Sequence, residues 1–554
     1  MLNPPHGEAT LRYDLLRFLI IDDNAVMRTW LRDPLIRSGA RHISMASTFD
    51  EALKHFKTGQ TFDVVLCDYH LGAGRDGQQL LEEARRGHLV SPATVWIMVT
   101  GETQYQQIFS AAELLPDDYL LKPFKSDLLH TRIARALTRA RALFEVNTLF
   151  FDQQWAPCIT ACRKKLEIQG IRYANEFRRI CGEAMLRAGL VREAHAFFLD
   201  VIRSGINYPW ARLGLARACF QLQQREQSLE LLEALIADSP DFLQAHDWVA
   251  RIQEETGRPE VAKEILSATL KKNPKALSRH REIVRVALAC DDVGTALEAY
   301  RSMHLHGRGS CFVTPGDFSG YAVLISGQVD KQRVIAALKG LAANLRDFYH
   351  RNDHFAFARN SIDYFTARTK GNEAMAKQAY VAMQGIDGRQ LDSCSRMAML
   401  HAAVDQDDTA TASLLAENLL LDCDGDRGME KQVLSAFPAH QRDAVTKAAR
   451  DASSRMRSAI GEAIALVRDG DYESAIGEFD HLTHRYPKIP VFYNAGVAVA
   501  KWIESGHCDI EKLQLLNRYI THIEGIDPGC IALKRLRDFQ TNIQQFGTLA
   551  ELSM

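Results

Sequence analysis

The chain has 554 residues, more than one hydrophobic core usually organises, so several domains are expected. Its 67 Lys and Arg residues nearly balance 69 Asp and Glu residues, and the formal charge of −2 gives no overall attraction to nucleic acid. The N-terminus lacks the pattern of a signal peptide and no apolar run reaches ~18 residues, so we expect a cytoplasmic protein without membrane insertion.

The N-terminal quarter of the chain alternates short apolar runs with amphipathic stretches. This pattern is typical of a parallel sheet covered by helices on both faces. The predicted strands are 18–21, 43–46, 64–67, 95–99 and 119–121. Five strands with intervening helices predict a flavodoxin-like, doubly wound α/β domain, in which ligands bind at the carboxyl ends of the strands.

Polar side chains follow four of these strands, at the edge where ligands bind. They are Asp22, Asp23, Asp68, Thr100 and Lys122. Three carboxylates cannot remain ionised side by side without a counter-charge, because like charges raise each other's pKa. Mg²⁺ provides one, since it prefers oxygen ligands and binds through one or two carboxylates plus phosphate. A hydroxyl and an ammonium group can then stabilise phosphoryl oxygens, which is what phosphoryl transfer requires.

These residues and their neighbours resemble the motifs of the chemotaxis-type receiver family, over roughly residues 15–140. The matching motifs are Asp22-Asp23, Asp68, Thr100-Gly101 and the run from Tyr119 to Phe124. The resemblance implies that Asp68 is the phosphoacceptor and that a sensor histidine kinase or a phosphotransfer protein is a partner. Two departures are a longer loop after Asp68 without the common proline, and Pro34, which should kink or shorten the first helix.

The resemblance also implies the roles of the other site residues. The implied metal ligands are Asp22, Asp23, Asp68 and the backbone carbonyl of His70, with Asp22 acting mainly through water. Thr100 and Tyr119 would form the switch pair, and Lys122 would contact the phosphoryl group. A cis peptide bond between Lys122 and Pro123 is typical of the family.

A glycine pattern beside Asp68 imitates a different class of site. Gly72, Gly74 and Gly77 match the dinucleotide-binding fingerprint, which would predict NAD or FAD. However, four residues separate the strand from Gly72, and the next strand ends at Thr100 rather than at an acid for the ribose. We therefore expect these glycines to form the turn beside the phosphorylation site.

A long helix should follow the receiver domain. Apolar residues recur at helical spacing from Leu129 to Phe144, and no Gly or Pro interrupts the chain before Pro157. We expect a rigid helical connector at the end of a receiver domain at 16–145, which follows an N-terminal extension at 1–15.

A period of 34 residues follows. Small residues recur at this interval, a bulky residue stands four positions after each, and Pro240 and Pro274 keep the same spacing. The small residues are Ala194, Ser228, Ala262 and Ala296. The pattern predicts paired helices and resembles the tetratricopeptide repeat (TPR) family, which implies an all-α solenoid. We expect TPR-like repeats at 150–306 and 456–545, with a divergent helical region at 307–455 between them.

The repeats show no catalytic motif, so the leading hypothesis is an adaptor whose TPR-like region gains or loses a protein partner when Asp68 is phosphorylated. No enzyme chemistry is expected beyond the receiver's own phosphorylation and dephosphorylation. The alternative is an enzymatic regulator, such as a phosphatase, concealed in 307–455. Neither a calcium loop at 422–428 nor a metal pair at His350 and His354 is complete. No DNA-binding helix-turn-helix is apparent, so nucleic acid is not an expected partner. A homodimer remains an alternative.

Overall fold

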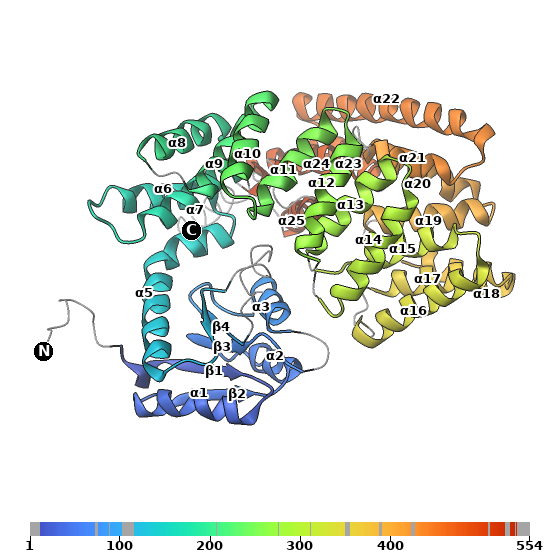
Figure 1. Cartoon of the computed structure of the whole chain (residues 1–554). Helices are drawn as coiled ribbons and strands as arrows, with labels where there is room; N and C mark the ends of the chain where they lie inside the picture. The colour runs from blue at the N-terminus through green and yellow to red at the C-terminus, as the bar shows by residue number, and fades with distance from the viewer. Residues whose placement is uncertain are drawn as a thin grey trace, which may run out of the picture. The chain divides into compact units, whose positions relative to one another are not determined.

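The computed structural model (Figure 1) describes most of the chain. The described residues are 11–72, 76–87, 89–101, 116–205, 208–274, 276–310, 312–349, 355–386, 391–422, 427–507, 510–526, 532–533, 535–537 and 539. The chain divides into two compact units, Met1–Thr314 with Ala343–Arg351, and Pro315–Ala342 with Asn352–Met554. Among the described helices, none is both long and apolar enough to cross a bilayer.

The N-terminal part forms a five-stranded parallel sheet. Its strands are β1 (Arg17–Ile21), β2 (His42–Ala46), β3 (Val64–Asp68), β4 (Val95–Thr100) and β5 (Asp118–Leu121). They lie in the order β2-β1-β3-β4-β5, so the direction of winding reverses between β1 and β3. This is the flavodoxin-like arrangement that the sequence predicted, with each strand placed within one residue of its expected bounds. Its switch point puts the ends of β1 and β3 side by side.

Helices cover both faces of the sheet. They are α1 (Ala25–Arg37), α2 (Phe49–Lys57), α3 (Gly77–Arg86) and α5 (Ser126–Phe151). Alternate residues of β1 enter two separate cores, since Phe18 and Ile20 pack with α1 and α5, whereas Leu19 and Ile21 pack with α2 and α3. Pro34 does not end α1, which continues three residues further, to Arg37.

Helix α5 belongs to two hydrophobic cores. Its first half buries Leu129, Ile133 and Leu137 against the receiver sheet. Its second half buries Leu143 and Val146 in the first core of the helical region. The expected helical connector is therefore present, and it runs six residues past the predicted domain end, to Phe151.

Antiparallel helix pairs follow α5. They comprise α6 (Trp155–Leu166), α7 (Ala174–Arg187), α8 (Val191–Arg203), α9 (Pro209–Gln221), α10 (Arg225–Asp238), α11 (Leu243–Glu255), α12 (Pro259–Lys272), α13 (Leu277–Ala289) and α14 (Val293–His306). The small residue Ala194 and the bulky Phe198 are both buried, as the 34-residue pattern requires. The Phe198 ring packs where Gly182 and Gly214 lack side chains, because a Cβ on either glycine would lie 2.4 or 2.3 Å from Cζ.

The rest of the described chain is also helical. Its helices are α15 (Pro315–Ser326), α16 (Lys331–Tyr349), α17 (Ala356–Thr369), α18 (Glu373–Gln384), α19 (Ser393–Asp405), α20 (Thr409–Asp422), α21 (Arg427–Ser435), α22 (Ala439–Asp469), α23 (Tyr472–Arg485), α24 (Ile489–Glu504) and α25 (Ile510–Ile526). The Asp392 carboxylate accepts from the Ser395 amide at 2.7 Å and from the Gly316 amide at 2.9 Å, so it caps α19 and α15 together. His350, His354 and most of the acidic run at 422–428 lie outside the described residues.

Candidate phosphoacceptor site

Three carboxylates meet at the carboxyl edge of the sheet. Asp22 and Asp23 follow β1, and Asp68 is the last residue of β3. One oxygen of each lies within 4.8 Å of the others. Asp22 is fully buried, Asp68 is partly buried and Asp23 is exposed. A cluster of oxygen donors open to solvent on one side fits a hard cation such as Mg²⁺, which keeps several waters.

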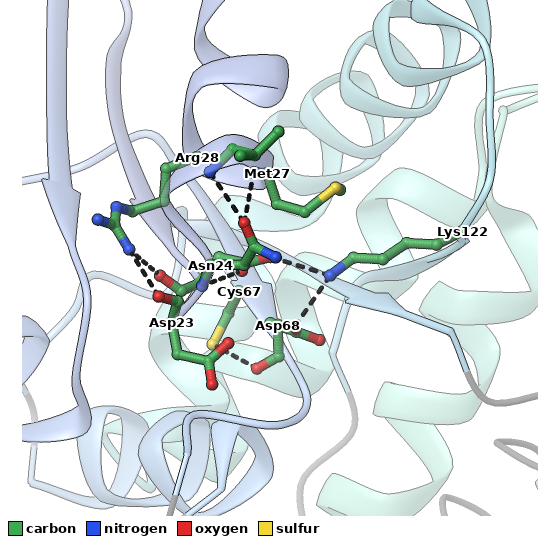
Figure 2. A network of polar contacts seen from close by, with 9 residues as sticks. Asp23, Asn24, Met27, Arg28, Cys67, Asp68 and Lys122 are labelled. Atoms are coloured by element: carbon green, nitrogen blue, oxygen red, sulfur yellow. Dashed lines mark hydrogen bonds and ion pairs between the residues drawn. The ribbon is translucent and has the colours of Figure 1, made fainter.

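Lys122 provides the positive charge at this cluster. Its Nζ donates to Oδ2 of Asp22 and to Oδ2 of Asp68, each at 2.9 Å (Figure 2). Burial raises the pKa of Asp68, and the hydrogen bond from Lys122 opposes that rise. Burial also lowers the pKa of Lys122, but its bonds to Asp68 and Asp22 outweigh burial and leave that pKa raised. Lys122 therefore stays cationic and neutralises part of the charge of the carboxylates.

The turn between β1 and α1 is held from two directions. The backbone amide of Asn24 donates to Oδ1 of Asp22 at 2.9 Å. The side-chain oxygen of Asn24 caps α1 by accepting from the backbone amide of Val26. Nη1 of Arg28 donates to the backbone carbonyls of Asp22 at 2.6 Å and Asp23 at 3.1 Å. The sequence interpretation missed Arg28, since an arginine in the second turn of a helix reads as a solvated surface residue.

Gly77, the first residue of α3, lies close to Asp68. The Gly77 amide donates to the Tyr69 carbonyl at 2.8 Å, and a Cβ on Gly77 would lie 2.1 Å from the Asp68 carbonyl oxygen. The buried Cys67 thiol donates to the same oxygen at 3.3 Å. Gly77 therefore serves close packing at Asp68, and the turn expected from the three glycines stays a prediction. Gly74 lies outside the described residues.

The remaining predicted residues lie at the same edge. Thr100 ends β4 and is buried, and Tyr119 on β5 packs against the core that contains Trp96 and Met98. His70 is exposed, and it follows Asp68 by two residues in the sequence. The peptide bond from Lys122 to Pro123 is cis, as the family resemblance implied. The roles of the switch pair and of the His70 carbonyl remain predictions.

Comparison with known proteins points to one family. The model of the response regulator receiver domain matches residues 18–134. The transcriptional regulatory protein DltR of Streptococcus agalactiae is 31% identical over 134 residues, which cover 24% of this chain and 57% of that protein. The chain thus spans little more than half the length of that relative.

Two further likenesses cover whole receiver domains. The chemotaxis protein CheY of Pseudomonas aeruginosa is 29% identical over 124 residues, covering 22% of this chain and 98% of that protein. The solved receiver domain of NtrX from Brucella abortus is 29% identical, with a TM-score of 0.20. The match covers 22% of this chain and 98% of the NtrX chain. The strand order, the carboxylate cluster and the family match all indicate a receiver domain. Residues 18–134 are a response regulator receiver domain, and a long all-helical region follows it in the same chain.

Proposed function

We propose that the protein is a response regulator of a two-component phosphorelay, in which Asp68 accepts a phosphoryl group from a sensor histidine kinase or a phosphotransfer protein. The observation that carries the proposal is the cluster of Asp22, Asp23 and Asp68 with Lys122 bridging two of them. An Asp68 oxygen forms the new bond to phosphorus as the bond from phosphorus to the donor's imidazole nitrogen breaks. Mg²⁺, when bound, supplies charge that offsets the phosphoryl oxygens.

The residues around Asp68 support this chemistry. Lys122 already donates to Asp68, so its ammonium is placed to donate to a phosphoryl oxygen attached there. The Thr100 hydroxyl, at the neighbouring strand end, would provide a further hydrogen bond. Asp22 and Asp23 would hold the cation with Asp68 and with the carbonyl of His70.

We further propose that the output is a change in protein binding by the TPR-like helices, with the protein acting as an adaptor in the cytoplasm. The shared helix α5 supports this proposal, because it packs in the receiver core and in the first helical core at once. Helix-pair arrays offer extended surfaces for partners. In this proposal the helical region carries no enzyme activity of its own.

Small phosphodonors test the proposed reaction directly. The full-length protein is incubated with phosphoramidate and Mg²⁺, and the acyl phosphate is mapped by mass spectrometry. We expect labelling at Asp68 alone, lost in EDTA and in Asp68→Asn. Asp33→Asn, which changes an exposed carboxylate paired with Arg32, is the matched control and should label normally. Undiminished labelling of Asp68→Asn would show that the acceptor lies elsewhere.

A further inference from the structure

Arg28 contacts the acidic turn in a way that the proposed chemistry has not yet used. A single nitrogen, Nη1, donates to the carbonyl oxygens of Asp22 at 2.6 Å and of Asp23 at 3.1 Å (Figure 2). Both carbonyls precede Asn24, the residue that caps α1, so the hydrogen bonds of that helix do not use them. Arg28 therefore ties the turn that carries two of the three carboxylates to the second turn of α1.

Among the described residues, the other hydrogen bonds of the turn reach the Asp22 carboxylate. Asp22 is held by the Asn24 amide and by Lys122, each at 2.9 Å. Asp23 is exposed, and its carbonyl accepts a hydrogen bond from Arg28. Together with the backbone hydrogen bonds of Asp22 and Asn24, that contact fixes the direction in which the Asp23 side chain leaves the backbone.

We propose that Arg28 is a positioning residue for the cation, holding the turn so that the Asp22 and Asp23 carboxylates face Asp68. The proposal rests on the Mg²⁺-dependent phosphorylation inferred above and names the residue that prepares its metal site. Groups that orient metal ligands, without touching the metal, typically contribute 10- to 100-fold in affinity.

A second effect of Arg28 has the opposite sign. Its positive charge repels a cation bound at the carboxylates, so removing the charge alone would tighten Mg²⁺ binding. The side chain is half-buried, and solvent and salt screen its charge, whereas its hydrogen bonds to the two carbonyls are direct. We therefore expect the loss of positioning to outweigh the loss of repulsion, and the sign of the change in affinity distinguishes the two effects.

The test measures Mg²⁺ binding to the full-length protein by titration calorimetry with MgCl₂. Arg28→Met removes the donors and the charge but keeps a long side chain with good helix propensity. Arg32→Met is the matched control, one turn further along α1, because the hydrogen bonds of Arg32 within the described chain go to the carboxylate of its neighbour Asp33. We expect Arg28→Met to raise the Kd for Mg²⁺ about 10-fold, with Arg32→Met close to wild type. Arg28→Lys, which keeps a cationic donor on a shorter side chain, should fall between them.

A kinetic measurement separates positioning from general damage. In phosphoramidate labelling of Asp68, the Mg²⁺ concentration for half-maximal rate should rise by the same factor in Arg28→Met, while the rate at saturating Mg²⁺ stays near that of wild type. Unchanged or tighter Mg²⁺ binding would overturn the proposal, and so would a lower saturating rate with unchanged affinity.

Two further outcomes are distinguishable. If Arg28→Met does not fold, Arg28→Lys against Arg32→Lys decides, and equal Mg²⁺ affinity in those two variants overturns the proposal. If wild type itself neither binds Mg²⁺ nor labels at Asp68, the proposed phosphorelay function fails, and the role of Arg28 fails with it.

Discussion

At the scale of single residues, Gly77 shows how closely the chain is packed around Asp68. A methyl group there would lie 2.1 Å from the Asp68 carbonyl oxygen and 2.9 Å from the Cys67 Sγ. A backbone carbonyl cannot move aside without moving Asp68 itself. We expect Gly77→Ala to cost about 1–3 kcal/mol of stability and to slow phosphorylation. Gly477→Ala, on an exposed helical position with nothing within 4 Å, is the control and should be neutral or stabilising. Urea unfolding measures the stability, and phosphoramidate labelling measures the rate of phosphorylation. Wild-type values of both for Gly77→Ala would refute the packing argument.

His280 should make the stability of the helical region depend on pH. It is fully buried, and its Nε2 lies 2.8 Å from the Pro274 carbonyl oxygen. Burial lowers its pKa, and the positive charges of His306, Arg279 and Arg281 lower it further. The hydrogen bond with the Pro274 carbonyl raises the pKa and so opposes this shift. The folded protein keeps His280 neutral, whereas the unfolded chain takes up a proton as the pH falls through about 6.5. Its contribution is therefore complete above that pH and is lost progressively below it, toward the lower pKa of the folded state.

The variant His280→Gln tests whether His280 causes stability to fall as the pH is lowered. His280→Gln retains a donor for the Pro274 carbonyl but cannot titrate, so we expect its stability to fall less than that of wild type between pH 7 and about 5.5. His246→Gln is the control, since His246 contacts the Pro240 carbonyl at 3.0 Å one repeat earlier and is more exposed. Chemical unfolding at several pH values gives the slopes. A His280→Gln slope equal to that of wild type would exclude this histidine as the source.

At the scale of elements, α5 decides where the helical region begins. Leu143 and Val146 are buried in its first core, and the Val146 carbonyl accepts from the Cys158 thiol at 3.5 Å. A fragment of residues 141–554 should give a helical far-UV spectrum and a cooperative melt. A fragment of 155–554 should melt lower, because it loses two core side chains worth roughly 1.5–3 kcal/mol each.

An exposed residue in the same helix is the control for that comparison. Phe144→Ala in the 141–554 fragment changes a side chain that is 44% exposed, so it should alter the melting temperature little. Equal melting temperatures for the two fragments would mean that α5 does not stabilise the first helical core.

The strands and the carboxylate edge could be predicted because their signals are local. A short apolar run that ends at Asp68 or Thr100 marks both a strand and its carboxyl end. Arg28 could not be predicted, since its partners are main-chain carbonyls that become neighbours only in the folded turn. Asp392 is similar, because it caps α15 at the amide of Gly316, 76 residues earlier in the chain. The apolar stripe of α5 gives no domain boundary, since it changes partners along the helix rather than stopping.

At the scale of the whole molecule, a signal from Asp68 can reach the helices only through an element that has two arrangements. We infer that Thr100 moves toward the phosphoryl oxygens, that Tyr119 fills the space it leaves, and that α5 transmits the change, since one helix lies in both cores. Beryllofluoride, which mimics the phosphoryl group, should then change amide hydrogen exchange in α6 and α7.

Thr100→Ala isolates this route. It should still label at Asp68, yet lose most of the beryllofluoride-induced change in exchange at residues 155–187. A coupling of about 1–3 kcal/mol corresponds to a 5- to 150-fold change in local opening. Asp68→Asn, which lacks the acceptor carboxylate, is the control and should not respond. Because Thr100 lies at the end of β4, far in sequence from α6, an equal response in wild type and Thr100→Ala would place the route elsewhere in the receiver domain.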